Sequence, residues 1–163
     1  KIIFKTKISY LFYTLLIYDK MISNSSKYAI KAVLYLALHS SEENKVMVKD
    51  MAEPINVPQA YIAKLLQELA KRKLISSTRG PKGGFYLSEE DKNGNALNIV
   101  RAIDSEKKLN SCILSLEHCN ENKPCPLHHV INPSRTTLMK NLKTKTIYEL
   151  SQDVKNGKSY LPL

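Results

Sequence analysis

Apolar residues recur with helical spacing over much of the chain, and the clearest run lies near its middle. Four of them stand at i, i+3, i+4 and i+7, the spacing of one core-facing helical stripe: Ile62, Leu65, Leu66 and Leu69. Pro58 stands just ahead and suits the first helical position, where its missing backbone N–H is not needed. The pattern therefore predicts an amphipathic helix that starts at Pro58.

The pattern after this helix is that of a short hairpin. Leu74–Ser77 is too short for another helix and fits a strand, and Phe85–Leu87 fits the returning strand. The glycine-rich run Arg79–Gly84 between them predicts a turn. A helix followed by a hairpin with a basic, glycine-rich tip is typical of the recognition helix and wing of a winged helix-turn-helix. The alternative is a solvated helix beside an incidental hairpin.

Two helices are predicted ahead of this pair. Residues 24–26 offer capping side chains to a first helix, whose stripe is Ile30, Val33, Leu34, Ala37 and Leu38. A second, short helix is predicted at Val48–Glu53, stopped by Pro54, and residues 55–57 form the turn before the recognition helix. The order helix, short helix, turn, helix, hairpin predicts a mainly α fold with a small β-hairpin wing.

Three helical segments are predicted after the hairpin, each with its own start signal. Asn95 is a candidate cap for a short helix that carries Leu97, Val100, Arg101 and Ile103. Asn132 is a candidate cap for a helix that opens with Pro133 and has Leu138, Met139 and Leu142 as its stripe. Thr146 is a candidate cap for a last segment, Ile147–Val154.

The charge balance points to an anionic partner. The chain has 25 Lys and Arg against 15 Asp and Glu, a formal net charge of +10 in 163 residues. Between Lys64 and Lys82, six basic residues face a single acid, Glu68. Basic groups gathered on an exposed hairpin and the helix beside it favour nucleic acid as the partner.

The winged-helix order assigns DNA contacts to particular residues. The first turns of the recognition helix meet base edges in the major groove, and here they carry Gln59, Ala60, Tyr61 and Lys64. Gln pairs with adenine, Lys with guanine or phosphate, and Tyr61 is either a DNA contact or a core residue. At the wing tip, Arg79 suits a minor groove, Lys82 a phosphate, and Gly83 a close backbone approach.

Cysteine occurs only at Cys112, Cys119 and Cys125, all in one short segment. An odd, clustered set is a poor disulfide framework and favours a reducing compartment with metal or redox chemistry. His128 follows at ligand spacing, so three thiolates and an imidazole make a four-ligand set for zinc or an iron–sulfur cluster. The tight pair of cysteines usual in structural zinc sites is absent. Three alternatives stay open: a cluster, zinc, or thiols that bind nothing and only oxidise.

The first twenty residues differ in composition from the rest of the chain. They lack an initiating Met, and their apolar run is too short to span a bilayer. Met21 offers a natural start, so residues 1–20 are interpreted as translated upstream sequence or a non-native extension, with an amphipathic anchor as the alternative.

Several motifs together resemble the Rrf2 family of bacterial transcription regulators. They are SKYAIKAVLYLAL, AYIAKLLQELAKRKLISS, RGPKGGFYL, ALNIVRAID and CPLHHV, so the resemblance covers Met21 to about Leu150. It implies a homodimer built from a winged-helix domain and a long dimerisation helix, acting at palindromic promoter sites. Within the family, the chain is most similar to the iron–sulfur-binding branch, which implies a [2Fe–2S] cluster on Cys112, Cys119, Cys125 and His128.

The chain departs from the family pattern at three places. Ala63 stands where many relatives carry an acidic residue, the first gap between cysteines is one residue longer than in the iron–sulfur branch, and Pro133 is expected to kink or delay the dimerisation helix. The expected division of the chain is an extension at 1–20, a winged helix-turn-helix domain at 21–104, a cluster-binding loop at 105–129, a dimerisation region at 130–155 and a flexible tail at 156–163.

The resulting interpretation is a cytoplasmic, homodimeric repressor that binds double-stranded DNA. Its operator affinity is set by a cluster that senses iron, redox or nitric oxide status. The alternative is a regulator of the same type that holds no cluster and responds to a small metabolite or a partner protein, or one with structural zinc. No membrane association is expected. No oriented nucleophile–base pair or phosphate loop is visible in the sequence, so an enzyme is not expected either.

Overall fold

The computed structural model describes residues 22–112, 114 and 121–163. These residues form a mainly helical fold with one antiparallel hairpin, as predicted. In chain order the elements are α2 (Asn24–His39), α3 (Val48–Ile55), α4 (Gln59–Lys71), β1 (Ser76–Thr78), β2 (Gly84–Tyr86), α5 (Glu89–Lys92), α6 (Ala96–Leu109), α7 (His128–Thr144) and α8 (Ile147–Lys155).

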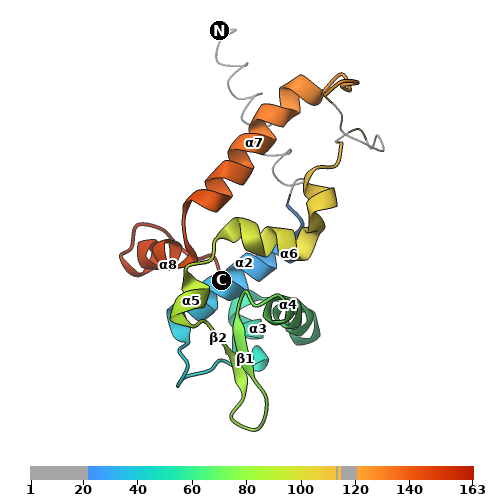
Figure 1. The fold of residues 1–163 in the computed structure, drawn as a ribbon. Helices are drawn as coiled ribbons and strands as arrows, with labels where there is room; N and C mark the ends of the chain where they lie inside the picture. The colour runs from blue at the N-terminus through green and yellow to red at the C-terminus, as the bar shows by residue number, and fades with distance from the viewer. Residues whose placement is uncertain (1–21, 113, 115–120) are drawn as a thin grey trace.

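Helix α2 runs through the middle of the body and packs against α3, α4, α6 and α8 (Figure 1). The hairpin projects from one end of the body, while α7 extends away from the opposite end before α8 returns to it (Figure 1). The largest fully buried apolar side chains come from α2, α3, α4, α6, α8 and the chain just after β2: Leu36, Met51, Ile55, Ile62, Leu66, Leu69, Leu87, Ile147, Val33 and Val100.

The predicted helix–hairpin unit is confirmed. Pro58 is the N-cap of α4, and the four residues of the predicted stripe are the four that the helix buries: Ile62, Leu65, Leu66 and Leu69. Strand β1 pairs with β2 so that Ser76 faces Tyr86 and Thr78 faces Gly84. Gly84 lies against the backbone of Val46, whose N–H and carbonyl both bond Phe85. This bridge ties the hairpin to the loop before α3.

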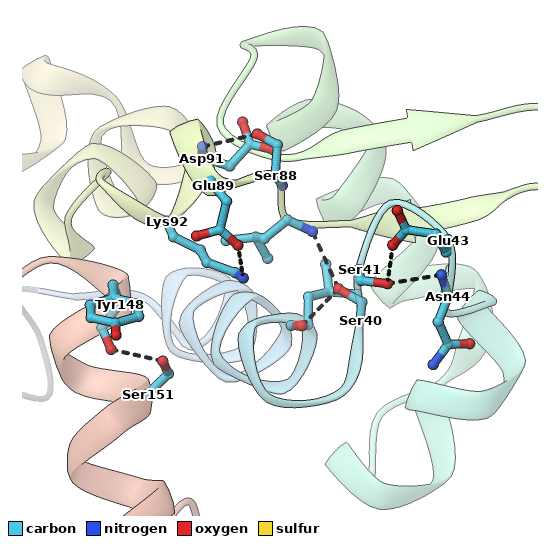
Figure 2. A network of polar contacts seen from close by, with 12 residues as sticks. Ser40, Ser41, Glu43, Asn44, Ser88, Glu89, Asp91, Lys92, Tyr148 and Ser151 are labelled. Atoms are coloured by element: carbon cyan, nitrogen blue, oxygen red, sulfur yellow. Dashed lines mark hydrogen bonds and ion pairs between the residues drawn. The ribbon is translucent and has the colours of Figure 1, made fainter.

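Serine and aspartate side chains anchor the base of the hairpin to the body (Figure 2). The Ser40 hydroxyl donates to the Leu36 carbonyl at 2.7 Å and accepts from the Leu87 N–H at 3.2 Å, which joins the end of α2 to the chain after β2. The Asp91 carboxylate accepts from the Ser76 hydroxyl at 2.7 Å and from the Ser88 N–H at 3.0 Å. These bonds tie both strands of the hairpin, at its base, to neighbouring segments of the body.

Two predictions about the first helices are wrong in detail. Helix α3 does not stop at Pro54 but continues to Ile55, and it ends at Asn56, which adopts the left-handed conformation (φ 56°). Pro54 cannot donate to the Asp50 carbonyl, and the Tyr35 hydroxyl approaches that oxygen at 3.5 Å. The buried face of α2 is also rotated from the predicted stripe: it consists of Ser26, Ala29, Ala32, Val33, Leu36 and Ala37. Small alanine side chains on this face let neighbouring helices approach closely.

Helix α6 begins as predicted and then kinks. The Asn95 side chain accepts from the Asn98 N–H at 3.1 Å, which confirms it as the cap. The helix carries a break at Ser105, whose backbone (φ 63°, ψ 153°) lies in a region that residues other than glycine rarely adopt. Neither this break nor the short helix α5 was predicted.

The predictions that Asn132 caps the following helix and that Pro133 delays its start are wrong. Helix α7 begins at His128 and continues through Pro133 to Thr144. Its first turn forms ahead of the proline, where the Leu127 carbonyl accepts from the Ile131 N–H at 3.0 Å. Helix α8 starts at a capping box of Thr146 and Glu149, which confirms Thr146 as its cap. Beyond α8 the tail has no helix or strand, and Leu161 is buried.

Candidate functional site

The solvent-facing side of α4 is a row of polar and small residues. Ala60, Lys64, Gln67 and Lys71 recur at helical spacing on the face opposite the buried stripe, and all four are exposed. Gln59 and Tyr61 are exposed at its N-terminal end. The four recognition-helix residues singled out from the sequence therefore lie at the accessible start of one helix.

Tyr61 also has a structural role. Its hydroxyl is 2.6 Å from the Ser25 hydroxyl at the start of α2, and its ring meets Tyr28 edge-on with centroids 6.1 Å apart. The side chain is 37 % exposed, so it is neither a core residue nor a free surface group. Tyr61 thus joins the recognition helix to the first turn of α2.

Replacing Tyr61 by phenylalanine tests this joint. The variant keeps the ring contact with Tyr28 and loses the bond to Ser25, so we expect the free energy of unfolding to fall by roughly 0.5–1 kcal/mol. Urea denaturation measures the change, and Tyr148→Phe, at an exposed position of α8, is the matched control that should not differ from wild type. Equal stability of both variants would show that the Ser25 bond does not hold α4.

A cleft lies between the recognition helix and the hairpin. It has a volume of about 610 Å³ and is lined by Gln67, Ala70, Lys71, Ser77, Thr78, Arg79 and Phe85. The sequence did not point to Gln67, Ser77 or Thr78; helical spacing from Lys64 would have placed Gln67 on this face. Arg72, by contrast, pairs with Glu68 at 2.6 Å, which lowers the pKa of that carboxyl. The cleft therefore offers hydroxyls, an amide and two cations to an anionic chain.

The wing tip presents its two cations to solvent, and its glycines serve the turn itself. Arg79 and Lys82 are exposed. Gly80 has a φ of 108°, and its carbonyl accepts from the Gly83 N–H at 2.9 Å. A Cβ at Gly83 would lie 2.4 Å from the Thr78 carbonyl oxygen, so only glycine fits there. Gly83 is thus needed for the turn itself, and its close approach to DNA stays a prediction.

Cys112 and Cys125 meet where the chain leaves α6 and enters α7. Their sulfur atoms are 3.6 Å apart, and the residues are 5 % and 8 % exposed. They line a cavity of about 10 Å³ together with His128, Leu127, Ile131, Asn132 and Arg135. Cys119, the third predicted ligand, lies outside the described residues. Two of the three thiols and the predicted imidazole therefore share one small cavity.

Helical spacing places three of the lining side chains on one face of α7. His128 lies in the first turn of α7, and its backbone N–H donates to the Cys125 carbonyl at 2.9 Å. Asn132 and Arg135 follow at helical spacing and line the same cavity. The Arg135 guanidinium donates to the Ser111 carbonyl at 2.7 Å and so holds the peptide next to Cys112. Arg135 was not predicted from the sequence, although its distance of seven residues from His128 indicates a shared face.

The thiol pair fits a metal-bound arrangement in its sulfur spacing. Two thiolates on one tetrahedral metal, each with a bond of roughly 2.3 Å, lie about 3.8 Å apart, close to the 3.6 Å found here. Among the residues that the structure describes, no three Cys, His, Asp or Glu side chains come close enough together to hold a metal ion. In the described part of the chain, His128 therefore does not form a metal-binding group with the two thiols, although it lines the same cavity.

Known proteins resemble the chain over nearly all of this framework. A family model described as "Iron-dependent Transcriptional regulator", that of the Rrf2 family, matches residues 22–153. The chain belongs to the Rrf2 family. An HTH-type transcriptional regulator of Aquifex aeolicus is 31 % identical over 130 residues, which cover 78 % of this chain and 89 % of that protein. The HTH-type transcriptional regulator NsrR of Oceanobacillus iheyensis is 28 % identical over 137 residues, 83 % of this chain and 90 % of that protein.

Among solved structures, "T. potens IscR" superimposes with a TM-score of 0.64 at 22 % identity, covering 85 % of this chain and 90 % of that one. It shows that the two share a fold. The Rrf2 protein described here is thus a DNA-binding transcription regulator with a winged helix, and its relatives are regulators rather than enzymes. No helix in the described part of the chain is long and apolar enough to cross a membrane.

In this Rrf2 protein a buried carboxylate connects the cysteine-bearing segment to the winged helix. Asp104, just before the kink in α6, is 6 % exposed. Its carboxylate accepts from the Ser23 N–H at 2.9 Å and the Ser26 hydroxyl at 2.8 Å, both at the start of α2. It also pairs with the Lys108 ammonium at 2.8 Å, on the far side of the kink.

The ionisation of Asp104 follows from these contacts. Burial disfavours the charged form, but hydrogen bonds from Lys108 and from the two serines of α2 outweigh it and hold the pKa below its ordinary value. A second ion pair, Arg101 with Glu106 at 2.9 Å, also spans the kink at Ser105. Two ion pairs therefore connect the residues before the strained Ser105 to the residues after it. Cys112 follows shortly after the end of the same helix.

Proposed function

We propose that this protein is a cytoplasmic, homodimeric repressor that binds palindromic DNA operators and whose operator affinity is set by a [2Fe–2S] cluster. The proposed ligands are Cys112, Cys119, Cys125 and His128. The observation that carries the proposal is the pair of buried thiols at 3.6 Å, with His128 lining the same cavity at the junction of α6 and α7. Soft sulfur donors with one imidazole are the ligand chemistry that such clusters accept.

The residues around the thiols have clear tasks in this proposal. An iron–sulfur cluster, when bound, supplies a redox-active group that oxidants destroy. Arg135 fixes the Ser111 peptide beside Cys112 and lines the same cavity as the two thiols. Ile131 and Leu127 provide apolar walls that limit access of water.

A continuous set of contacts leads from this cavity to the recognition helix. Cys112 follows the second part of α6, whose position relative to the first part depends on the Ser105 kink and the Lys108–Asp104 pair. Asp104 holds the first turn of α2 through Ser26, and the adjacent Ser25 bonds the Tyr61 hydroxyl on α4. A change in the cysteine segment can therefore bias the position of α4, provided that ligand binding differs between the two arrangements.

Dimerisation through α7 completes the proposal. The helix extends away from the body (Figure 1), and Leu138, Met139 and Leu142 lie half-buried along it while Val130 is 66 % exposed. An apolar helix face that the described residues cover only in part suits a second copy related by a two-fold axis. Two winged helices related in this way would read a palindrome.

Anaerobic purification tests the function most directly. We expect a coloured protein with about two irons and two sulfides per chain, whose affinity for the operator upstream of its own gene or a selected palindrome changes when the cluster is removed. Stoichiometric zinc without sulfide would identify a structural zinc site instead. A colourless, metal-free protein that still binds its operator would favour a regulator that responds to a small metabolite or a partner protein.

The wing contacts with DNA lead to a prediction about two neighbouring cations. Arg79→Ala is expected to weaken operator binding by roughly 1–3 kcal/mol, because Arg79 lines the cleft beside the recognition helix and reaches a groove. Lys82→Ala should weaken binding to all sequences alike and reduce the salt dependence by about one unit of slope, as expected for a single phosphate contact. Fluorescence anisotropy over a series of salt concentrations measures both effects.

The matched control is Lys155→Ala, which removes an exposed lysine from α8, away from the hairpin (Figure 1). It should bind like wild type. If both wing variants also bind like wild type, the hairpin does not touch the operator.

A further inference from the structure

Cys112 and Cys125 bring their thiols into direct contact. In the structure the Cys112 thiol donates to the Cys125 sulfur at 3.6 Å, and both residues are at least nine-tenths buried. A disulfide has a sulfur–sulfur bond of about 2.05 Å, so an approach of roughly 1.5 Å would join them. The folded chain thus holds two thiols next to each other by its own packing.

We propose that Cys112 and Cys125 are a redox-modification site that closes to an intramolecular disulfide in the metal-free protein. The oxidant class is a peroxide, with hydrogen peroxide as the simplest member. This inference does not rest on the proposed cluster, because it concerns the thiols themselves.

The chemistry needs no group beyond the pair and the peroxide. The thiolate of one cysteine attacks a peroxide oxygen, the O–O bond breaks, and a sulfenic acid and hydroxide form. The second thiol then attacks the sulfenic sulfur, the S–O bond breaks, and water leaves as the S–S bond forms. Two thiols and one hydrogen peroxide give one disulfide and two waters, and the two electrons that the sulfurs lose reduce the peroxide.

The surroundings favour the second step over further oxidation. The partner sulfur already touches the one that is oxidised, so the intramolecular attack needs only a small rearrangement. Arg135 anchors the peptide beside Cys112 to α7, the helix that begins just after Cys125, and so keeps the two segments together.

The disulfide and a bound metal exclude each other. Closing the bond consumes both described sulfurs of the cavity, which then cannot ligate zinc or iron. Oxidised protein should therefore bind no metal until a dithiol reduces the disulfide. The redox state of the cysteine pair would thus control whether the protein can bind a metal ion.

Mass spectrometry of the metal-free protein tests the proposal. The protein is treated with one equivalent of hydrogen peroxide and digested without reduction by a protease that cleaves after glutamate. Glu106, Glu117, Glu121 and Glu149 separate the three cysteines into peptides 107–117, 118–121 and 122–149. We expect a loss of about 2 Da in the intact mass and a link between peptides 107–117 and 122–149.

Single variants make the assignment unambiguous. Cys119→Ser should form the same link at a similar rate, whereas Cys112→Ser and Cys125→Ser should slow disulfide formation at least tenfold. Oxidised wild-type protein should take up no zinc, and reduction with dithiothreitol, followed by removal of the dithiol, should restore uptake to the level of the untreated protein. Zinc is the probe because its binding can be measured whether or not the protein carries a cluster.

Three results would overturn the proposal. They are a dominant link that involves peptide 118–121, a disulfide between two chains on a non-reducing gel, and a gain of oxygen at Cys112 or Cys125 with no link. If the link forms in a protein that never acquires iron and sulfide under anaerobic conditions, the disulfide proposal stands and the cluster proposal fails.

Discussion

Replacing Cys125 by alanine is expected to abolish the visible absorption of anaerobically purified protein. A cluster seldom survives the loss of a sulfur ligand, and the Cys125 sulfur lies 3.6 Å from that of Cys112 in the same cavity. Cys112→Ala and Cys119→Ala should have the same effect. His128→Ala should be milder and leave a more labile or spectrally shifted cluster, because water or another side chain can take its place. Absorption spectra with iron and sulfide assays measure all four variants.

His129→Ala is the matched control for these variants. His129 stacks edge-on against His128, with ring centroids 5.3 Å apart, but it is exposed and does not line the cavity. It should keep the chromophore. A second measurement compares operator binding by the variant that lacks all three cysteines with binding by anaerobically purified wild-type protein. Equal affinity for every operator would mean that any bound cluster has no regulatory effect.

Asp104→Asn is expected to cause the largest loss of stability among these variants, roughly 2–3 kcal/mol in the free energy of unfolding. The carboxylate accepts three hydrogen bonds while nearly fully buried, and an amide would turn a donor toward groups that themselves donate. Glu106→Gln is the control, because it removes an exposed ion pair from the same helix and should change stability little. Urea denaturation distinguishes the two.

The pH dependence of stability offers an independent check of the same contact. Because the pKa of Asp104 is lowered in the folded protein, its contribution is complete above the unfolded value of about 3.9 and is lost as the pH falls through the folded value. Wild type should therefore lose more stability than Asp104→Asn in this acidic range. Parallel losses in both proteins would show that another carboxylate governs acid unfolding.

Asp104→Asn also tests communication between the cysteine cavity and DNA. If the path through Asp104 and Ser26 carries the signal, the folded variant should keep its chromophore while the ratio of operator affinities with and without cluster moves toward one. An unchanged ratio would mean that the two sites communicate by another route.

The sequence by itself determined the elements whose signals are local. The stripe of α4 shows in the spacing of Ile62, Leu66 and Leu69, and all three are buried as predicted. Asn95 and Thr146 cap their helices because a capping side chain bonds an N–H three residues away, within reach of any sequence window. The glycines of the wing tip predicted a turn for the same reason, since its backbone angles depend on the residues within it.

Proline was the local signal that misled. Both Pro54 and Pro133 lie inside helices, where each removes one backbone hydrogen bond without ending the helix. The first turn of α7 forms ahead of Pro133, from the Ile131 N–H to the Leu127 carbonyl. In α3, Tyr35 from α2 approaches the carbonyl that Pro54 leaves at Asp50. The propensity of a single residue is therefore a weaker guide than the packing of the helix that contains it.

Only the tertiary structure decided the features that join distant segments. The face of α2 that became buried depends on where α6 and α4 cross it, so its alanines outweigh the larger side chains of the predicted stripe. Asp104 accepts hydrogen bonds from Ser23 and Ser26, which lie 81 and 78 positions away in the sequence. Two ion pairs that span Ser105 stabilise its strained backbone. Arg135 likewise donates to the carbonyl of a distant residue, Ser111. Sequence spacing predicted that the cysteines belong to one site. The distance between their sulfur atoms, however, depends on how α6 and α7 pack. Contacts between distant segments are set by the packing of the whole core and not by the residues adjacent in sequence.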